Sequence, residues 1–288
     1  QNNLSVDLAS PKGGQVEADG FNEEKAYNQA VLEDPGVLEL LDNTLPTSEV
    51  DPSAYHAVYV VGGKGAMFDL PYDASLQDIL LNMYRREGTV ISAVCHGPAA
   101  FVNVKDGDRF IIKDIDISGF CNLEEELFGK KWVNEFPFML EDKLKSRGAN
   151  FHQADFMLSN VAVSGKFITG QNPFSTTRSA EEVVKALGIE PVERTLYNDE
   201  KSIYLIQDIL ENNKSILWAE QELIKSSESY DMPLIAVWGY YKILASKENQ
   251  EEMMKGIKMV ELTEPYFFNE NLQLAMAETY STLGQKQK

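Results

Sequence analysis

The sequence predicts an α/β fold: a doubly wound parallel sheet with helices on both faces, followed by a C-terminal all-α appendage. Two observations predict this. Over residues 1–192, short runs of β-branched residues alternate with segments of helical spacing, as in βαβ units. After about Pro191 no strand pattern remains, and helical spacing recurs as far as Leu283. We therefore expect an α/β domain at 1–192 and a helical extension at 193–288.

Strands of the first domain are expected where short apolar runs are β-branched or alternate with polar residues. They lie at Leu4–Ala9, Val58–Val61, Val90–Val94, Ile115–Phe120, Val161–Ser164 and Phe167–Thr169. Helices are expected in two pieces within Phe21–Leu41, at Ser75–Arg86 with Ser75 as N-cap, at Pro137–Arg147 and at Ser175–Leu187. Gly148 and Gly188 end the last two.

Five helices are expected in the extension, at Ile203–Leu210, Ile216–Ile224, Pro233–Leu244, Glu251–Leu262 and Leu272–Leu283. Their small and aromatic residues loosely match tetratricopeptide-type helix pairs, but any bundle packed on small residues gives the same pattern. We expect the large side chains to form a core rather than a binding groove: Trp218, Trp238, Tyr240, Tyr241, Phe267 and Phe268. The extension could cap a dimer face or recruit a protein partner.

Composition excludes several classes of function. The chain has 288 residues, 43% hydrophobic and 25% charged, with a net charge of −19. That charge argues against nucleic-acid partners and anionic membranes, which require clustered Lys and Arg. No apolar run is long enough to span a bilayer, and no signal peptide opens the sequence.

The numbers of cysteines and histidines bear on the cellular compartment and on possible metal sites. Two cysteines form no disulfide framework, which fits a reducing compartment, so we expect a cytoplasmic protein. The three histidines, His56, His96 and His152, show no metal-ligand spacing with either cysteine. No metal or organic cofactor is expected.

The segment TVISAVCHGPAA at 89–100 carries the clearest chemical signal. An apolar strand stops at Cys95, and Pro98 suits the first turn of a following helix. A cysteine on such a turn lies above the sheet edge and faces the positive end of a helix dipole, which favours the reactive thiolate. The alternative is a small buried hydrophobe, as many lone cysteines are. His96 and the small residues after it favour the nucleophile.

Four motifs, in order, resemble the ThiJ/PfpI superfamily: VVGGKGAMFDLP at 60–71, SAVCHGPA at 92–99, SGFCNLEE at 118–125 and ITGQNP at 168–173. With DLASPKGG at 7–14, they are similar to the branch of glutathione-independent glyoxalases (glyoxalase III) and heat-shock chaperone-like relatives. The resemblance covers residues 4–188 and does not reach the helical extension. It implies the flavodoxin-like fold and a homodimer.

The resemblance also implies roles for single residues. Cys95 matches the family nucleophile, His96 its triad histidine and Glu125 the acid that orients that histidine. Without the resemblance, the acidic run at 124–126 reads as a solvated helix start. Gly63 and Lys64 match the oxyanion and substrate loop, with the backbone N–H groups of Gly63 and Cys95 expected to hold the oxyanion.

Three departures from the family pattern are visible. Lys64 stands where the branch usually has His, which bears on substrate preference. The family's first strand and a glutamate that bonds the cysteine have no counterpart, so either the natural protein begins before Gln1 or another segment fills the place. Cys121 stands where relatives tend to have Ser or Thr; it is either half of a redox pair or an ordinary buried thiol.

The resemblance implies an enzyme that converts a 2-oxoaldehyde such as methylglyoxal into a 2-hydroxy acid such as D-lactate. A lyase of this kind needs no glutathione. Two alternatives stay open: a cysteine hydrolase of the same superfamily (amidase, peptidase or deglycase), and a non-catalytic redox sensor or holdase chaperone of the stress response.

Overall fold

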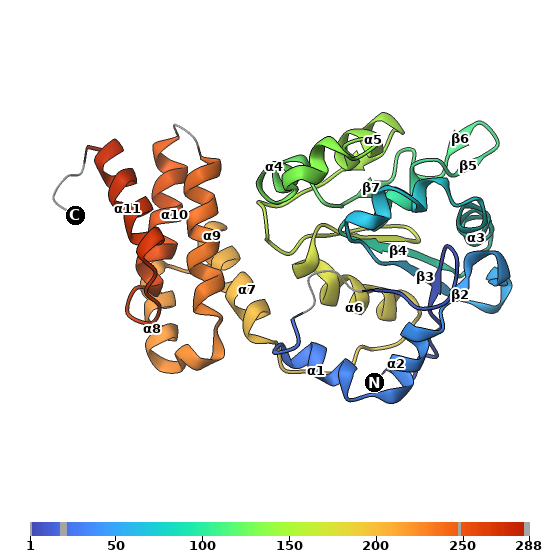
Figure 1. Cartoon of the computed structure of the whole chain (residues 1–288), viewed down its shortest axis with the longest axis horizontal. Coiled ribbons are helices and arrows are strands. Elements are labelled where there is room, and N and C mark those ends of the chain that lie inside the picture. Colours follow the sequence, from blue (N-terminus) through green and yellow to red (C-terminus); the bar gives the residue numbers. More distant parts are fainter. Residues whose placement is uncertain (1, 18–21, 247–248, 285–288) are drawn as a thin grey trace. The chain divides into compact units, whose positions relative to one another are not determined.

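The computed structural model describes residues 2–17, 22–246 and 249–284. Contacts between residues divide the chain into two compact units. The α/β unit comprises residues 1–154 and 160–192, and the helical unit comprises 155–159 and 193–288. Figure 1 shows a sheet between helices in the first and a bundle of helices in the second. The predicted fold class, α/β with a C-terminal helical region, is confirmed.

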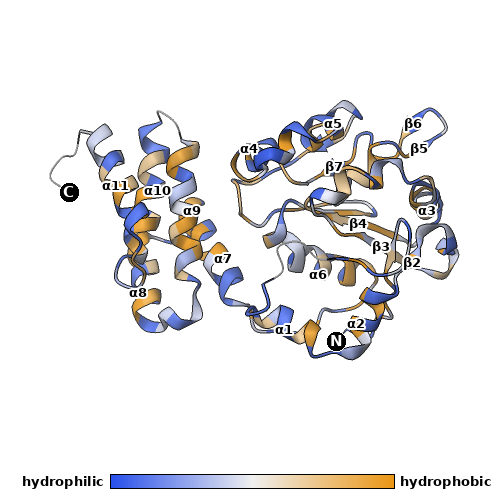
Figure 2. Cartoon of the chain, viewed as in Figure 1, coloured by the Kyte–Doolittle hydropathy of each residue, from blue (hydrophilic) through white to orange (hydrophobic). Residues whose placement is uncertain are grey.

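A four-stranded sheet forms the centre of the α/β unit, in the order β3 (Ala57–Val60), β4 (Val90–Val94), β10 (Phe167–Gly170), β9 (Val161–Ser164). β3, β4 and β10 are parallel, and β9 is antiparallel to β10. The central strand β4 is buried along its whole length, and it is coloured as hydrophobic in Figure 2. Burial on both faces explains why its sequence is a continuous apolar run.

Alternate residues of β4 serve the two faces of the sheet. Ile91 and Ala93 join the main core, which α3 (Ala74–Arg85) and α5 (Leu140–Ser146) cover. Val90 packs on the other face with Val183 of α6 (Thr176–Ala186). Helices therefore cover both faces of the sheet, as a doubly wound fold requires.

Shorter strand pairs surround the sheet. β1 (Ala9–Ser10) pairs with β2 (Leu45–Pro46), β5 (Lys105–Asp106) with β6 (Arg109–Phe110), and β7 (Asp116–Ile117) with β8 (Asn150–Phe151). The expected strands at 4–9 and 115–120 were too long, because only Ala9 of the first lies in β1 and only Asp116 and Ile117 of the second lie in β7. Helices α1 (Ala26–Leu32) and α2 (Pro35–Asp42) take up the expected broken helix, whose first residue, Phe21, is outside the described residues.

The structure corrects the predicted N-cap of α3. Asp73, not Ser75, is the N-cap of α3, and its carboxylate accepts the N–H of Leu76. A carboxylate at this position also favours the positive end of the helix. The expected ends at Gly148 and Gly188 are confirmed, since both have positive φ after α5 and α6.

The helical unit contains α7 (Asn198–Leu210), α8 (Ile216–Ser226), α9 (Met232–Ala245), α10 (Gln250–Thr263) and α11 (Glu270–Thr282). All five expected helices are confirmed. α9 and α10 approach most closely at Gly239 and Gly256, where a Cβ on either glycine would lie 2.6 Å from the carbonyl of the other. Trp238 stacks on Phe156 and donates its indole N–H to the Phe156 carbonyl, so the segment 155–159 packs with this bundle. The tetratricopeptide interpretation stays a prediction.

Candidate active site

Cys95 lies on a strained turn directly after β4. Its φ is +61°, a conformation that is uncommon for residues other than glycine. Two glycines allow the backbone to approach it. A Cβ on Gly62 would lie 2.8 Å from the Cys95 Cβ, and one on Gly97 would lie 2.3 Å from the Val60 carbonyl. Strain of this kind persists where the surroundings enforce it, and it often marks a functional site.

The segment after Cys95 differs from the expected helix. Gly97–Phe101 forms a 3₁₀ helix of five residues, with Pro98 in its first turn. So short a segment supplies little of the dipole that we expected to favour the thiolate. The neighbouring imidazole is therefore the main source of positive charge beside the sulfur.

Cys95, His96 and Glu125 are brought together in one line. The Cys95 Sγ lies 3.3 Å from His96 Nδ1, and His96 Nε2 lies 2.7 Å from Glu125 Oε1. His96 is 2% exposed and Glu125 is fully buried, while Cys95 is partly exposed. Burial lowers the pKa of His96, but its hydrogen bonds to Cys95 and Glu125 outweigh burial and raise that pKa to about 9. An imidazolium beside the sulfur stabilises a thiolate.

Helix α4 (Asn122–Phe128) carries both Glu124 and Glu125, and the two carboxylates make different contacts. Glu124 accepts the backbone N–H of Cys121 and the side-chain amide of Asn172, so it caps the helix from within the core. Glu125, one residue later, points its carboxylate at His96. Glu124 and Glu125 are therefore not the solvated residues of a helix start, because both are buried.

The loop at Gly63 and Lys64 follows β3 and lies beside the cysteine turn. Gly63 has φ +97°, which favours glycine, and Lys64 is half-buried at the start of a 3₁₀ turn. The expected oxyanion role of the Cys95 N–H is wrong, since this group donates to the Gly170 carbonyl at 2.9 Å. In the part of the chain that the structure describes, the N–H groups of Gly63 and His96 have no hydrogen-bond acceptor.

Comparison with known proteins shows the family of this chain. The sequence pattern of the DJ-1/PfpI family matches residues 1–186. The chain belongs to the DJ-1/PfpI family.

Several members of this family are similar in sequence. "Glyoxalase 3" of Candida albicans is 34% identical over 152 residues, covering 51% of this chain and 64% of that protein. "Glutathione-independent glyoxalase HSP31" of Saccharomyces cerevisiae is 29% identical over 179 residues, covering 60% and 71%. The chain spans 59–64% of the length of the first three curated relatives.

Two solved structures are also similar to this chain. Rapid Encystment Protein 24 KDa of Francisella tularensis superposes with a TM-score of 0.62 and 35% identity, covering 65% of this chain and 83% of that one. Glyoxalase III of Candida albicans gives a TM-score of 0.51 and 28% identity, covering 56% and 70%.

The second cysteine of this DJ-1/PfpI chain lies in a different environment from the first. Cys121 is 1% exposed at the N-cap of α4, and burial together with the nearby Glu124 carboxylate raises the pKa of its thiol. Both cysteines are free. These features favour the ordinary buried thiol over a redox partner for Cys95.

Sequence reasoning missed an aromatic cluster next to the triad. Phe120 and Phe136 lie 4.6 and 5.8 Å from the His96 ring, measured between centroids, and Phe68 lies 5.6 Å from Phe136. The signal was present, since Phe68 belongs to the VVGGKGAMFDLP motif.

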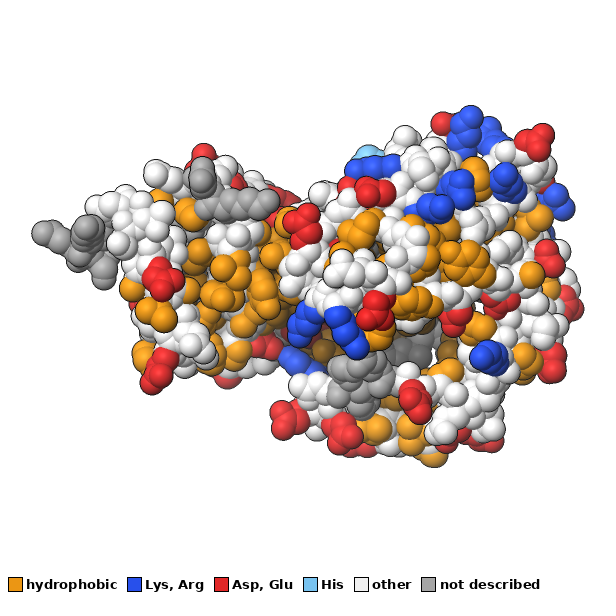
Figure 3. Space-filling view, turned by 45° about the horizontal axis from the view of Figure 1, so that its top comes forward, with side chains coloured by type: hydrophobic (Ala, Val, Ile, Leu, Met, Phe, Trp, Pro, Cys, Tyr) orange, Lys and Arg blue, Asp and Glu red, His pale blue; other side chains and the backbone are white. Residues whose placement is uncertain are grey.

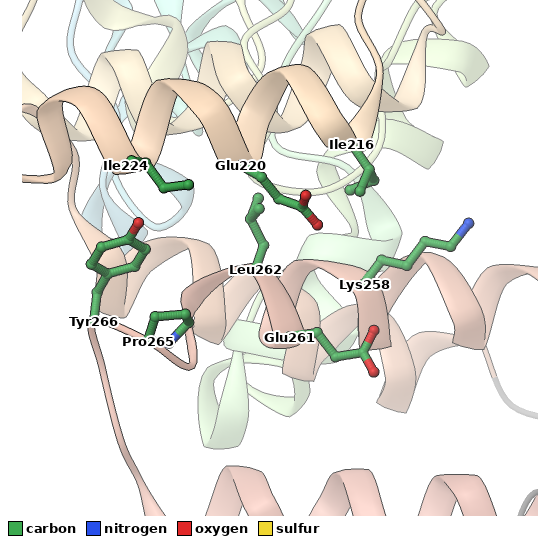
Figure 4. A pocket seen from close by; sticks show the side chains of 8 residues that line it. All are labelled: Ile216, Glu220, Ile224, Lys258, Glu261, Leu262, Pro265 and Tyr266. Atoms are coloured by element: carbon green, nitrogen blue, oxygen red, sulfur yellow. The ribbon is translucent and has the colours of Figure 1, made fainter.

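The helical unit contains a separate cavity of about 280 Å³. Figure 4 shows side chains of α8 and α10 lining it, among them Ile216, Glu220 and Leu262. Figure 3 shows hydrophobic side chains gathered on one face of this unit. A protein partner for these helices stays a prediction.

Within residues 2–17, 22–246 and 249–284, no group of three or more His, Cys, Asp or Glu side chains could hold a metal ion. None of the described helices is both long enough and apolar enough to cross a membrane.

Proposed function

We propose that the protein converts 2-oxoaldehydes such as methylglyoxal into 2-hydroxy acids such as D-lactate, without glutathione and with Cys95 as nucleophile. The observation that carries this proposal is the line from Cys95 Sγ through His96 to Glu125, with contacts of 3.3 and 2.7 Å. The names of the related glyoxalases support it.

The reaction begins with addition of the thiolate to the aldehyde carbon. A C–S bond forms, the carbonyl π electrons move to oxygen, and the His96 imidazolium gives that oxygen its proton. The product is a hemithioacetal, and His96 is left neutral. The N–H groups of Gly63 and His96 are the available donors for the transient oxyanion.

Neutral His96 then acts as the base. It removes the proton from the former aldehyde carbon, giving an enediolate, and the hydroxyl proton of the former aldehyde passes to the neighbouring oxygen. The His96 imidazolium then returns a proton to the neighbouring carbon while the negative oxygen re-forms a carbonyl, giving a thioester. Water adds to this thioester and gives one proton to His96, and the C–S bond breaks, releasing the hydroxy acid and the thiolate and restoring the imidazolium. Glu125 holds Nε2 throughout, so that Nδ1 faces the sulfur and the substrate.

The test is product analysis with methylglyoxal as the only substrate, in glutathione-free buffer made with D₂O. We expect D-lactate with deuterium at carbon 2, because the proton that His96 holds between its removal from one carbon and its return to the other exchanges with solvent. Lactate without deuterium would overturn the enediol step, and absence of lactate would overturn the function.

A redox sensor is the second candidate, and one observation favours it. Cys95 is partly exposed with an imidazole at 3.3 Å, whereas Cys121 is buried. Substoichiometric peroxide should then oxidise Cys95 to the sulfenic or sulfinic acid and spare Cys121. Selective oxidation without lactate formation would replace the enzyme by the sensor.

The same three residues also suit a cysteine hydrolase. Release of ammonia, peptide fragments or free amino acid from amide, peptide or glycated substrates, with no lactate from methylglyoxal, would favour that alternative.

A further inference from the structure

Three aromatic rings join the two segments that flank the triad. Phe68 lies 6.1 Å from Trp132 and 5.6 Å from Phe136, between ring centroids, at interplanar angles of 68° and 49°. Phe136 in turn lies 5.8 Å from the His96 ring. These separations are those of favourable aromatic pairs. A continuous row of rings therefore leads from His96 to Phe68.

The row is built from the segments that carry the site itself. Phe68 ends the 3₁₀ turn that begins at Lys64, directly after Gly63. Trp132 and Phe136 follow α4, the helix that holds Glu125. The rings are thus fixed to the same two segments that position the loop glycine and the acid.

The outer end of this row is open to solvent. Phe68 is 41% exposed in spite of its two ring neighbours, and Trp132 and Phe136 are partly buried. Phe120, the other ring next to the imidazole, is only 9% exposed and belongs to the core. Apolar surface left uncovered on the turn that follows Gly63, at the end of a row of rings that begins at His96, is what an apolar substituent of a substrate would cover.

We propose that Phe68, Trp132 and Phe136 form an aromatic wall that receives the group attached to the 2-oxoaldehyde, so that the site prefers aromatic or bulky apolar substituents over methyl. This inference deepens the proposed function and depends on it for the reaction. The wall contacts the substituent and takes no part in proton transfer, so its effect is on discrimination between substrates.

The test compares kcat/KM for phenylglyoxal and methylglyoxal in three proteins. The wild type should prefer phenylglyoxal, and Phe68→Ala should lower the ratio about tenfold, because kcat/KM for phenylglyoxal falls more than kcat/KM for methylglyoxal. Phe268→Ala is the matched control, since this phenylalanine is 71% exposed in the helical unit. Phe68→Leu, which keeps apolar volume without a ring, serves if the alanine variant does not fold.

An unchanged ratio in the Phe68 variant would overturn the wall. So would an equal fall for both substrates, which is what a merely structural role predicts.

A second measurement separates failure of the wall from failure of the proposed function. Iodoacetanilide and iodoacetamide alkylate Cys95 without turnover and differ by a phenyl ring. The ratio of their rates, followed by peptide mass spectrometry, should fall about tenfold in Phe68→Ala. A fall in this ratio without hydroxy acid from either aldehyde (lactate from methylglyoxal, mandelate from phenylglyoxal) would leave the wall standing and reject the glyoxalase reaction. An unchanged ratio would reject the wall.

Discussion

The two cysteines of the α/β unit lie in regions with opposite properties. Cys95 follows a buried strand with φ +61°, is partly exposed and has an imidazole nitrogen 3.3 Å from its sulfur. Cys121 begins a helix with φ −90°, is 1% exposed and lies beside the Glu124 carboxylate. One region holds a thiol next to positive charge, and the other holds a thiol next to negative charge.

The comparison teaches that the backbone position of each cysteine determines the environment of its thiol. The strained turn exposes Cys95 and brings it to His96. The regular helix start buries Cys121 and lets Glu124 satisfy its backbone N–H. The reactive thiol therefore lies on the strained segment, whereas the thiol at the regular helix start is buried in a part of the chain that contributes to stability.

The largest expected difference is in alkylation. Iodoacetamide should modify Cys95 at least about a hundredfold faster than Cys121, because thiolate character and exposure both control the rate. Peptide mass spectrometry of native protein measures both rates at once. Equal rates would remove the basis for the enzyme and for the sensor.

Substitution of the neighbouring acids Glu125 and Glu124 should affect different properties, activity for the first and stability for the second. Glu125→Ala should lower kcat about a hundredfold, because His96 loses the carboxylate that orients it. Glu124→Ala should instead lower the free energy of unfolding by about 1–3 kcal/mol, because the Cys121 N–H and the Asn172 amide lose their acceptor. Turnover per folded molecule should stay within a few-fold of the wild type.

Steady-state kinetics and urea unfolding of both variants check this division. If Glu124→Ala lost activity while keeping its stability, the assignment of the two acids would be reversed.

The free energy of unfolding should depend on pH because His96 binds a proton more tightly in the folded protein than in the unfolded chain. The folded-state pKa of His96 is about 9, above the ordinary value of 6.5, so the folded protein binds this proton more tightly than the unfolded chain. The stabilisation is fully present below pH 6.5 and is lost as pH rises to about 9. It amounts to at most about 3 kcal/mol, since one pKa unit is about 1.4 kcal/mol.

Urea unfolding between pH 6 and pH 9.5 measures this loss. His96→Asn should flatten the decline, and an undiminished decline in the variant would show that another group causes it.

A smaller effect should distinguish two glycines of the substrate loop. Gly62→Ala should destabilise the protein by about 1–3 kcal/mol, because its Cβ would lie 2.6 Å from the Val94 carbonyl and 2.7 Å from the His96 nitrogen. Gly65→Ala is the control, since its Cβ would meet nothing within 4 Å. Thermal unfolding compares the two, and equal melting temperatures would contradict the close approach.

Much of the fold could be predicted from the sequence because its signals are local. The apolar run of β4 and the helical spacing of α7 to α11 each depend on residues within one segment. The Ser75 cap was wrong because Asp73 competes for the same N–H groups. The long strand at 4–9 was wrong because alternation describes an extended chain, whereas pairing requires a partner.

The site was predictable only in part, for the same reason. Cys95 and His96 are adjacent, but Glu125 is 29 residues from His96, and only the family resemblance selected it over Glu124. The acceptor of the Cys95 N–H, Gly170, lies on another strand, so the sequence could not show that this group is already bonded. The meeting of Phe68 with Trp132 is likewise a tertiary contact.

The most direct test of the difference between the two cysteines is lactate formation from methylglyoxal by three proteins: the wild type, Cys95→Ser and Cys121→Ser. Intact mass and circular dichroism of each would verify identity and folding. We expect Cys95→Ser to lose at least about a thousandfold in kcat, and Cys121→Ser to stay within about threefold of the wild type. Equal losses in the two variants, or lactate formation by Cys95→Ser at the wild-type rate, would contradict the assignment of Cys95 as the nucleophile.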